Sequence, residues 1–182
     1  MSRKLAVVFS VVVLTVSSAL AGNNPMVGGQ EMYPTKNIVQ NAVNSADHTT
    51  LVAAVKAAGL VDTLEGPGPF TVFAPTNEAF NKLPAGTVDT LLKPENKETL
   101  TKILTYHVVA GRLSASDLKK QIKAGGGTTQ LTTVEGGKLW ASIQDGNIML
   151  KDEKGGTALV TIPNVFQSNG VIHVIDSVVQ PN

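Results

Sequence analysis

The chain has 182 residues, with 15 Lys and Arg against 14 Asp and Glu, and it contains no cysteine. A nearly neutral chain without a basic cluster has no electrostatic basis for binding nucleic acid or anionic lipid, and the lack of cysteine excludes disulfides, thiol catalysis and a lipid-modified N-terminal cysteine. The length fits one domain that buries roughly 70% of its unfolded surface, which is enough to fold without disulfides.

The first 21 residues have the pattern of a cleavable signal peptide. Arg3 and Lys4 precede an apolar run from 5 to 16, and small residues offer a cleavage site that ends at Ala21. The run is shorter than the ~20 residues that span a bilayer, and no later stretch is long and apolar enough to do so. Cleavage leaves 161 residues with 13 basic and 14 acidic side chains. We therefore expect an exported protein without a membrane span, located in a periplasm, at a cell surface or in the medium.

The mature chain begins with a segment that has no periodicity. Residues 22–36 combine Gly, Asn, Pro and Met, which predicts a flexible leader before a single domain of residues 37–182. Helical spacing of apolar residues starts at the beginning of this domain. A second amphipathic helix follows, with Asp47 or Thr49 as its expected cap and Gly59 at its C-terminal end.

A strand that turns into a helix is predicted from Phe70, where the sequence reads Phe-Thr-Val-Phe-Ala-Pro-Thr-Asn-Glu-Ala-Phe. Phe70 and Phe73 lie in an alternating segment typical of a strand. Pro75 should end it, because proline has no backbone donor and disfavours helix in the residue before it. Thr76 can then cap a helix whose Phe80 returns to the core. Three of the eight aromatic residues lie on this corner, which favours a folding centre over an active site.

Helices and then strands are predicted beyond the corner. Apolar spacing predicts a helix from Asn96 through Val108, and another helix starts at Ser114 or Ser116. After a run of three glycines, turn residues separate stretches rich in Thr, Val and Ile, which are typical of hairpins. The last strand, 171–179, is apolar on both faces and should be central. Helices first and strands later predict an α+β fold.

Three stretches resemble, in order, the signatures of the fasciclin (FAS1) domain family. They are the corner at residues 70–80, Tyr-His-Val-Val at 106–109, and Asn-Gly-Val-Ile-His-Val-Ile-Asp at 169–176. The resemblance covers about Asn37 to Pro181. It implies one FAS1-like unit in which several helices pack along one side of a twisted β-sandwich or wedge.

The resemblance also implies a function and a site. It implies an adhesion or recognition module of the cell envelope or extracellular space that binds a cell-surface or matrix protein or a carbohydrate. It places the family's adhesion motif on Tyr106 and His107. It places the structural motif positions on Phe70, Phe73, Pro75, Thr76, Phe80, Asn169, Gly170 and His173.

The residues give little support for catalysis or for a bound metal. His48, His107 and His173 are widely separated in sequence, without the local pairs typical of metal ligands. His107 falls on the apolar stripe of its helix, so we expect it to be buried, hydrogen-bonded, and important for holding the surrounding surface in shape. His173 and Asp176 point to opposite faces of a strand, and no Gly-x-Ser-x-Gly elbow is present. We predict no catalytic residue, no metal and no cofactor.

Two other hypotheses remain open at this point. The chain could carry a small apolar ligand between helices and sheet; a pocket lined by Leu100, Leu104 and Val108 would favour this, whereas a solid interior with an exposed apolar patch would favour adhesion. A degradative enzyme would need a cleft with converging acid and base groups. The carboxylates of Asp152 and Glu153 flank a turn and are expected to be solvated.

Overall fold

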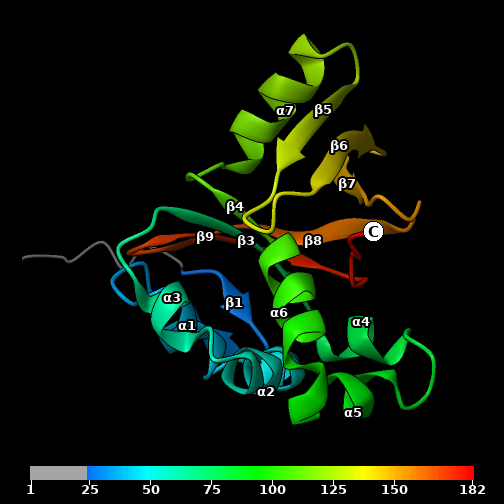
Figure 1. Ribbon diagram of the computed structural model, residues 1–182. Coiled ribbons are helices and arrows are strands. Elements are labelled where there is room, and N and C mark those ends of the chain that lie inside the picture. Colours follow the sequence, from blue (N-terminus) through cyan, green and yellow to red (C-terminus); the bar gives the residue numbers. More distant parts are fainter. Residues whose placement is uncertain (1–23) are drawn as a thin grey trace, which may run out of the picture.

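The computed structural model describes residues 24–182 (Figure 1). The predicted signal peptide of residues 1–21 lies outside the described residues. None of the helices in the described part has the length and apolar composition needed to cross a bilayer.

A seven-stranded mixed sheet in the order β4-β3-β9-β8-β7-β6-β5 organises the fold. Its strands are β3 (Phe70–Pro75), β4 (Val108–Ala110), β5 (Thr128–Thr132), β6 (Lys138–Gln144), β7 (Asn147–Lys151), β8 (Thr157–Gln167) and β9 (Gly170–Ile175). Among the strands of residues 24–182, only β3 and β9 pair in parallel. Register shifts in β8 interrupt its pairing with β9, and the long strand β8 joins the two halves of a wedge (Figure 1).

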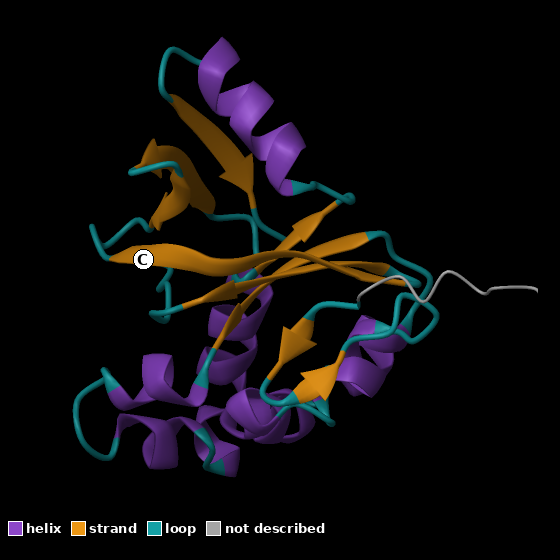
Figure 2. Cartoon of the chain, turned by 180° about the vertical axis from the view of Figure 1, so that it is seen from behind, coloured by secondary structure: helices purple, strands orange, loops and turns teal. Residues whose placement is uncertain are grey.

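The helices are distributed unequally over this wedge. Those of the described chain are α1 (Ile38–Ala42), α2 (Thr49–Ala58), α3 (Val61–Glu65), α4 (Asn77–Asn81), α5 (Thr87–Leu91), α6 (Lys97–Tyr106) and α7 (Ala115–Ala124), with the short turns η1 (Ala46–His48) and η2 (Pro94–Asn96). Helices α1 to α6 gather on one side of the sheet, whereas α7 packs on β5, β6 and β7 (Figures 1 and 2). The expected α+β fold is confirmed.

Two apolar clusters fill the two sides of the central strands. One lies between helices α1 to α6 and the sheet, and the other lies between α7 and the β5–β7 half. Val72 and Phe73, neighbours on β3, belong to different clusters, because successive strand residues point to opposite faces. All six residues of β9 are buried, as expected of the predicted central strand, but the strand ends at Ile175 rather than at Val179.

The predicted aromatic corner is confirmed. Phe73 is fully buried and Phe80 is 6% exposed. The Thr76 hydroxyl accepts a hydrogen bond from the Ala79 N–H at 3.2 Å and so caps α4. Pro75 is the last residue of β3.

The expected leader of residues 22–36 contains regular structure in the part that the structure describes. A small hairpin of β1 (Met26–Val27) and β2 (Gln30–Glu31) lies beside the helices (Figure 2). Val27 and Met32 are buried in the helical-side cluster. Strands of two residues are too short to show any periodicity, so the sequence pattern does not reveal them.

Two helix ends also differ from the predictions. Helix α6 ends at Tyr106, and Val108 already belongs to β4. The cap of α2 is neither Asp47 nor Thr49: the Asn77 side-chain oxygen accepts a hydrogen bond from the Thr50 N–H at 3.0 Å. Because this cap comes from another helix, spacing within the α2 segment could not indicate it.

Candidate functional site

Tyr106 and His107 lie where α6 passes directly into β4, and both side chains are buried. The Tyr106 hydroxyl donates to the Lys138 carbonyl and accepts from the Glu153 N–H at 3.2 Å. Burial raises the pKa of Tyr106 to about 12, so the hydroxyl keeps its proton at neutral pH. Tyr106 thereby ties the β5–β6 turn to the β7–β8 turn.

His107 holds a third segment, the C-terminal tail, next to the two turns that Tyr106 joins. Its Nε2 accepts a hydrogen bond from the Val179 N–H at 3.2 Å, and its Nδ1 lies 2.8 Å from the Ile103 carbonyl oxygen. Since Nε2 accepts, the proton of the neutral ring lies on Nδ1 and is donated to Ile103. Burial lowers the pKa of His107 to about 4, although the Ile103 carbonyl and the charge of Asp152 oppose this shift. The expectation of a buried, hydrogen-bonded ring is confirmed.

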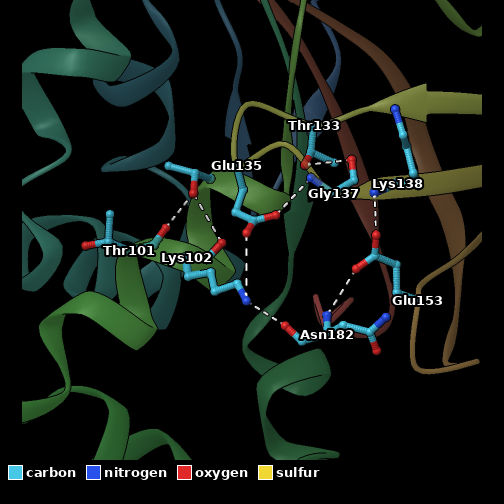
Figure 3. Close-up of polar contacts among 9 residues, drawn as sticks. Thr101, Lys102, Thr133, Glu135, Gly137, Lys138, Glu153 and Asn182 are labelled. Carbon is cyan, nitrogen blue, oxygen red and sulfur yellow. Dashed lines mark hydrogen bonds and ion pairs between the residues drawn. The ribbon is translucent and has the colours of Figure 1, made fainter.

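Side chains hold the C-terminal tail after β9. The Gln180 N–H donates to Asp152 at 2.9 Å. The Asn182 N–H donates to Glu153 at 3.1 Å (Figure 3). The Lys102 ammonium donates to the Asn182 carbonyl at 2.5 Å. Together with the bond from Val179 to His107, these contacts hold residues 179, 180 and 182 against the β7–β8 turn and the C-terminal half of α6.

Charged side chains surround this tail. Glu153 accepts from the Lys138 and Asn182 N–H groups, and these two bonds lower its pKa. Glu135 accepts from the Gly137 N–H at 2.9 Å and lies 3.8 Å from the Lys102 ammonium (Figure 3). We call the surface of residues 133–138, 152–154 and 177–182 the motif face. Val134 lies on it with 48% of its surface exposed.

Asp152 corrects one prediction from the sequence. We expected a solvated carboxylate, but it is 3% exposed and accepts from the Gly156 and Gln180 N–H groups. A side-chain oxygen that closes a turn is a common role for Asp before glycine, and Gly155-Gly156 follow closely. The bond to Gln180 joins parts of the chain that are distant in sequence, which no local pattern could have indicated.

The three histidines do not come together. His173 is fully buried, stacks on Phe73 at 5.7 Å between ring centroids, and lies 2.8 Å from the Leu113 carbonyl through Nε2. His48 lies near Ser45 at the start of α2. Within residues 24–182 no three His, Cys, Asp or Glu side chains are placed to hold a metal ion.

Asn169 is a structural residue of the last motif. Its side-chain oxygen accepts from the Ile38 N–H at 3.0 Å, and its amide donates to the Leu64 and Gly66 carbonyls. The resemblance marked Asn169 as a motif position, but the sequence alone could not name these partners. The adjoining Gly170 lies against β3: a Cβ there would come within 2.1 Å of the Phe70 carbonyl oxygen.

An apolar cavity of about 70 Å³ lies between the helices, the small hairpin and the sheet. Leu104 and Val108 line it as the carrier hypothesis required, whereas Leu100 is not among the lining residues. A cavity of about 150 Å³ can hold benzene. This one is therefore large enough for a small group but too small to enclose a drug-sized ligand.

These features define a FAS1-type domain. A solved structure, described as a FAS1 domain pair from the insect cell adhesion molecule fasciclin I, matches with a TM-score of 0.70 and 20% identity, over 79% of this chain and 50% of that one. The chain therefore spans half the length of that domain pair.

The fasciclin domain model matches residues 46–181, and the chain belongs to this family. Protein sll1483 of Synechocystis is 49% identical over 79% of this chain and 73% of its own length. The cell surface glycolipoprotein MPB83 of Mycobacterium bovis is 35% identical over 88% of this chain and 68% of its own length. The family expected from the three motifs is confirmed.

Proposed function

We propose that this chain is a non-catalytic adhesion module that binds a protein partner through the motif face. The observation that carries the proposal is that Tyr106 and His107, though buried, hold the three segments that form this face. The likeness to a domain pair from a cell adhesion molecule supports the general kind of function.

The composition of the motif face suits a protein partner. The face contains the exposed apolar side chain of Val134 and the charged residues Glu135, Lys138 and Glu153. Lys102 of the neighbouring helix α6 pairs with Glu135 (Figure 3). Protein interfaces commonly combine a small apolar centre with a polar rim. Positive and negative side chains alternate here, so the partner should carry complementary charges of both signs.

The location that fits this function is outside the cytoplasm. The basic and apolar pattern of residues 1–21 supports export, and MPB83 is a cell surface protein by its name. N-terminal sequencing of the protein from its native host tests this: a chain beginning at Gly22 supports the proposal, and a retained Met1 contradicts it.

The binding test uses a matched pair of substitutions. We compare Val134→Asp with Ile143→Asp, because Ile143 is similarly exposed at 44% but lies on β6, outside the motif face. Immobilised envelope and matrix proteins are titrated with the mature chain by surface plasmon resonance. We expect Val134→Asp to weaken binding at least tenfold and Ile143→Asp to leave it within twofold.

Treatments of the immobilised material separate the two partner classes. Protease treatment should abolish binding if the partner is a protein, whereas periodate oxidation should abolish it if the partner is a carbohydrate. Equal binding by both variants would show that the motif face makes no contact with the partner.

The carrier of a small apolar ligand remains the second candidate function. The cavity beside Leu104 and Val108 is the observation that favours it. Its volume of about 70 Å³ does not enclose a whole ligand, so adhesion remains the primary proposal.

A further inference from the structure

His48 is a buried histidine whose two ring nitrogens have different surroundings. The side chain is 3% exposed, and Nδ1 lies 2.9 Å from the Ser45 hydroxyl oxygen. Nε2 is buried and has no hydrogen-bond partner among the described groups. Burial lowers the pKa of His48. The Ala74 carbonyl favours the protonated ring and offsets only part of this lowering. The ring is therefore neutral at pH 7, with one nitrogen lacking a partner.

This histidine lines the apolar cavity. Ser45 and His48 are among its few polar lining side chains, and most of the others are aliphatic. Val27 comes from the small hairpin, Leu51 and Val55 from α2, and Ile172 from β9. A buried polar atom at an apolar wall is costly unless something bonds to it.

The state of the ring defines what would bind there. In the neutral ring, Nε2 is a donor if Nδ1 accepts from Ser45, and an acceptor if Nδ1 donates to Ser45. A hydroxyl group satisfies either form, because it both donates and accepts. A charged head group would lose its hydration at the apolar wall without a counter-charge. The matching ligand is therefore neutral, with one hydroxyl and an aliphatic body.

We infer that the cavity binds a small aliphatic alcohol, whose hydroxyl group pairs with His48 Nε2 while its first carbon atoms fill the space beside Val55 and Ile172. The exposed residues Lys56 and Val134 are also part of the lining. The alkyl group of a longer alcohol can therefore extend past them towards solvent. Val134 belongs to both the rim of the cavity and the motif face, but binding in the cavity can be tested without an adhesion partner.

The experiment titrates the isotope-labelled mature chain with straight 1-alkanols of two to six carbons, followed by NMR. Each added methylene should tighten binding about fourfold until the cavity is filled, after which the gain stops. The methyl signals of Val55 and Ile172 and the ring nitrogen signal of His48 should shift together. Shifts confined to residues outside the lining would overturn the inference.

Two variants and a paired ligand test the role of Nε2. His48→Leu should weaken 1-hexanol about fivefold, the value of one hydrogen bond, and leave n-hexane within twofold. Ile143→Asp is the control, because Ile143 lies on β6 outside the lining, and it should change 1-hexanol affinity less than twofold. Equal 1-hexanol affinity in His48→Leu and wild type would refute the pairing.

If His48→Leu does not fold, the NMR signal of His48 Nε2 in the wild-type protein tests the pairing instead. A shift of Nε2 with 1-hexanol but not with n-hexane supports the inference, and its absence overturns it. Because no adhesion partner enters these measurements, a negative result leaves the adhesion proposal standing. Val134 also lines the cavity, so the 1-hexanol titration is repeated on Val134→Asp: unchanged 1-hexanol affinity together with lost adhesion would show that the two sites act independently.

Discussion

Acidification should destabilise the protein through His107. The pKa of this ring is about 4 in the folded protein and about 6.5 when unfolded. Above pH 6.5 the ring is neutral in both states, so protonation does not affect stability. Between pH 6.5 and 4 the unfolded chain binds the proton and the folded chain does not, so stability falls with pH across this window and stops falling below it. At pH 5 the loss from His107 is about 2 kcal/mol.

The structure explains why the folded state resists the proton. A doubly protonated ring would turn Nε2 into a donor facing the Val179 N–H, which is itself a donor. The carboxylate of Asp152 favours the charged ring, but burial outweighs it. Protonation should therefore break the contact that fixes the middle of the C-terminal tail.

The measurement is a pair of urea titrations, at pH 7 and pH 5, on wild type and on His107→Gln. Glutamine does not titrate, and its amide can both donate to Ile103 and accept from Val179. The pKa values of His48 and His173 are also lowered by burial, so both proteins lose stability from these rings. Wild type should lose about 2 kcal/mol more than His107→Gln. Equal losses would refute the reasoning about His107.

Two further predictions concern the core and a helix cap. Phe73→Ala and Phe80→Ala should each lower the free energy of unfolding by ~3–5 kcal/mol, because truncated buried aromatics leave cavities; unchanged urea midpoints at pH 7 would place these rings outside the core. Asn77→Ala should cost about 1 kcal/mol by removing the cap of α2. An unchanged free energy of unfolding in Asn77→Ala would argue against the cap.

Local signals predicted much of the fold. At the corner around Phe73 and Thr76, the alternation typical of a strand, a proline and a helix-capping residue follow one another within a few positions. Ser114 was one of two predicted starts for α7, and its hydroxyl accepts from the Asp117 N–H at 3.2 Å. Hairpin glycines marked the turns of the β-rich half. Each of these features depends on residues close together in the sequence, so the pattern alone shows it.

The candidate site depends on contacts that no local pattern contains. Val179 lies 72 residues from His107, and Asn182 lies 29 residues from Glu153. Whether a turn carboxylate such as Asp152 faces solvent or the tail is decided by tertiary packing. The motif resemblance named Tyr106 and His107, but only the fold shows which segments they join.

The position of these two residues explains how a buried pair can control a surface. Helix α6 passes into β4 without a loop, and the His107 carbonyl accepts from the Phe73 N–H of β3 at 2.9 Å. The backbone of the motif is thereby fixed by the central sheet, while its side chains reach Lys138, Glu153 and Val179. Rigid sheet positions thus determine where the turn with Val134 and the C-terminal tail lie. A partner bound to the motif face would respond to changes in this pair without touching it, because loosening either anchor changes the shape of the face.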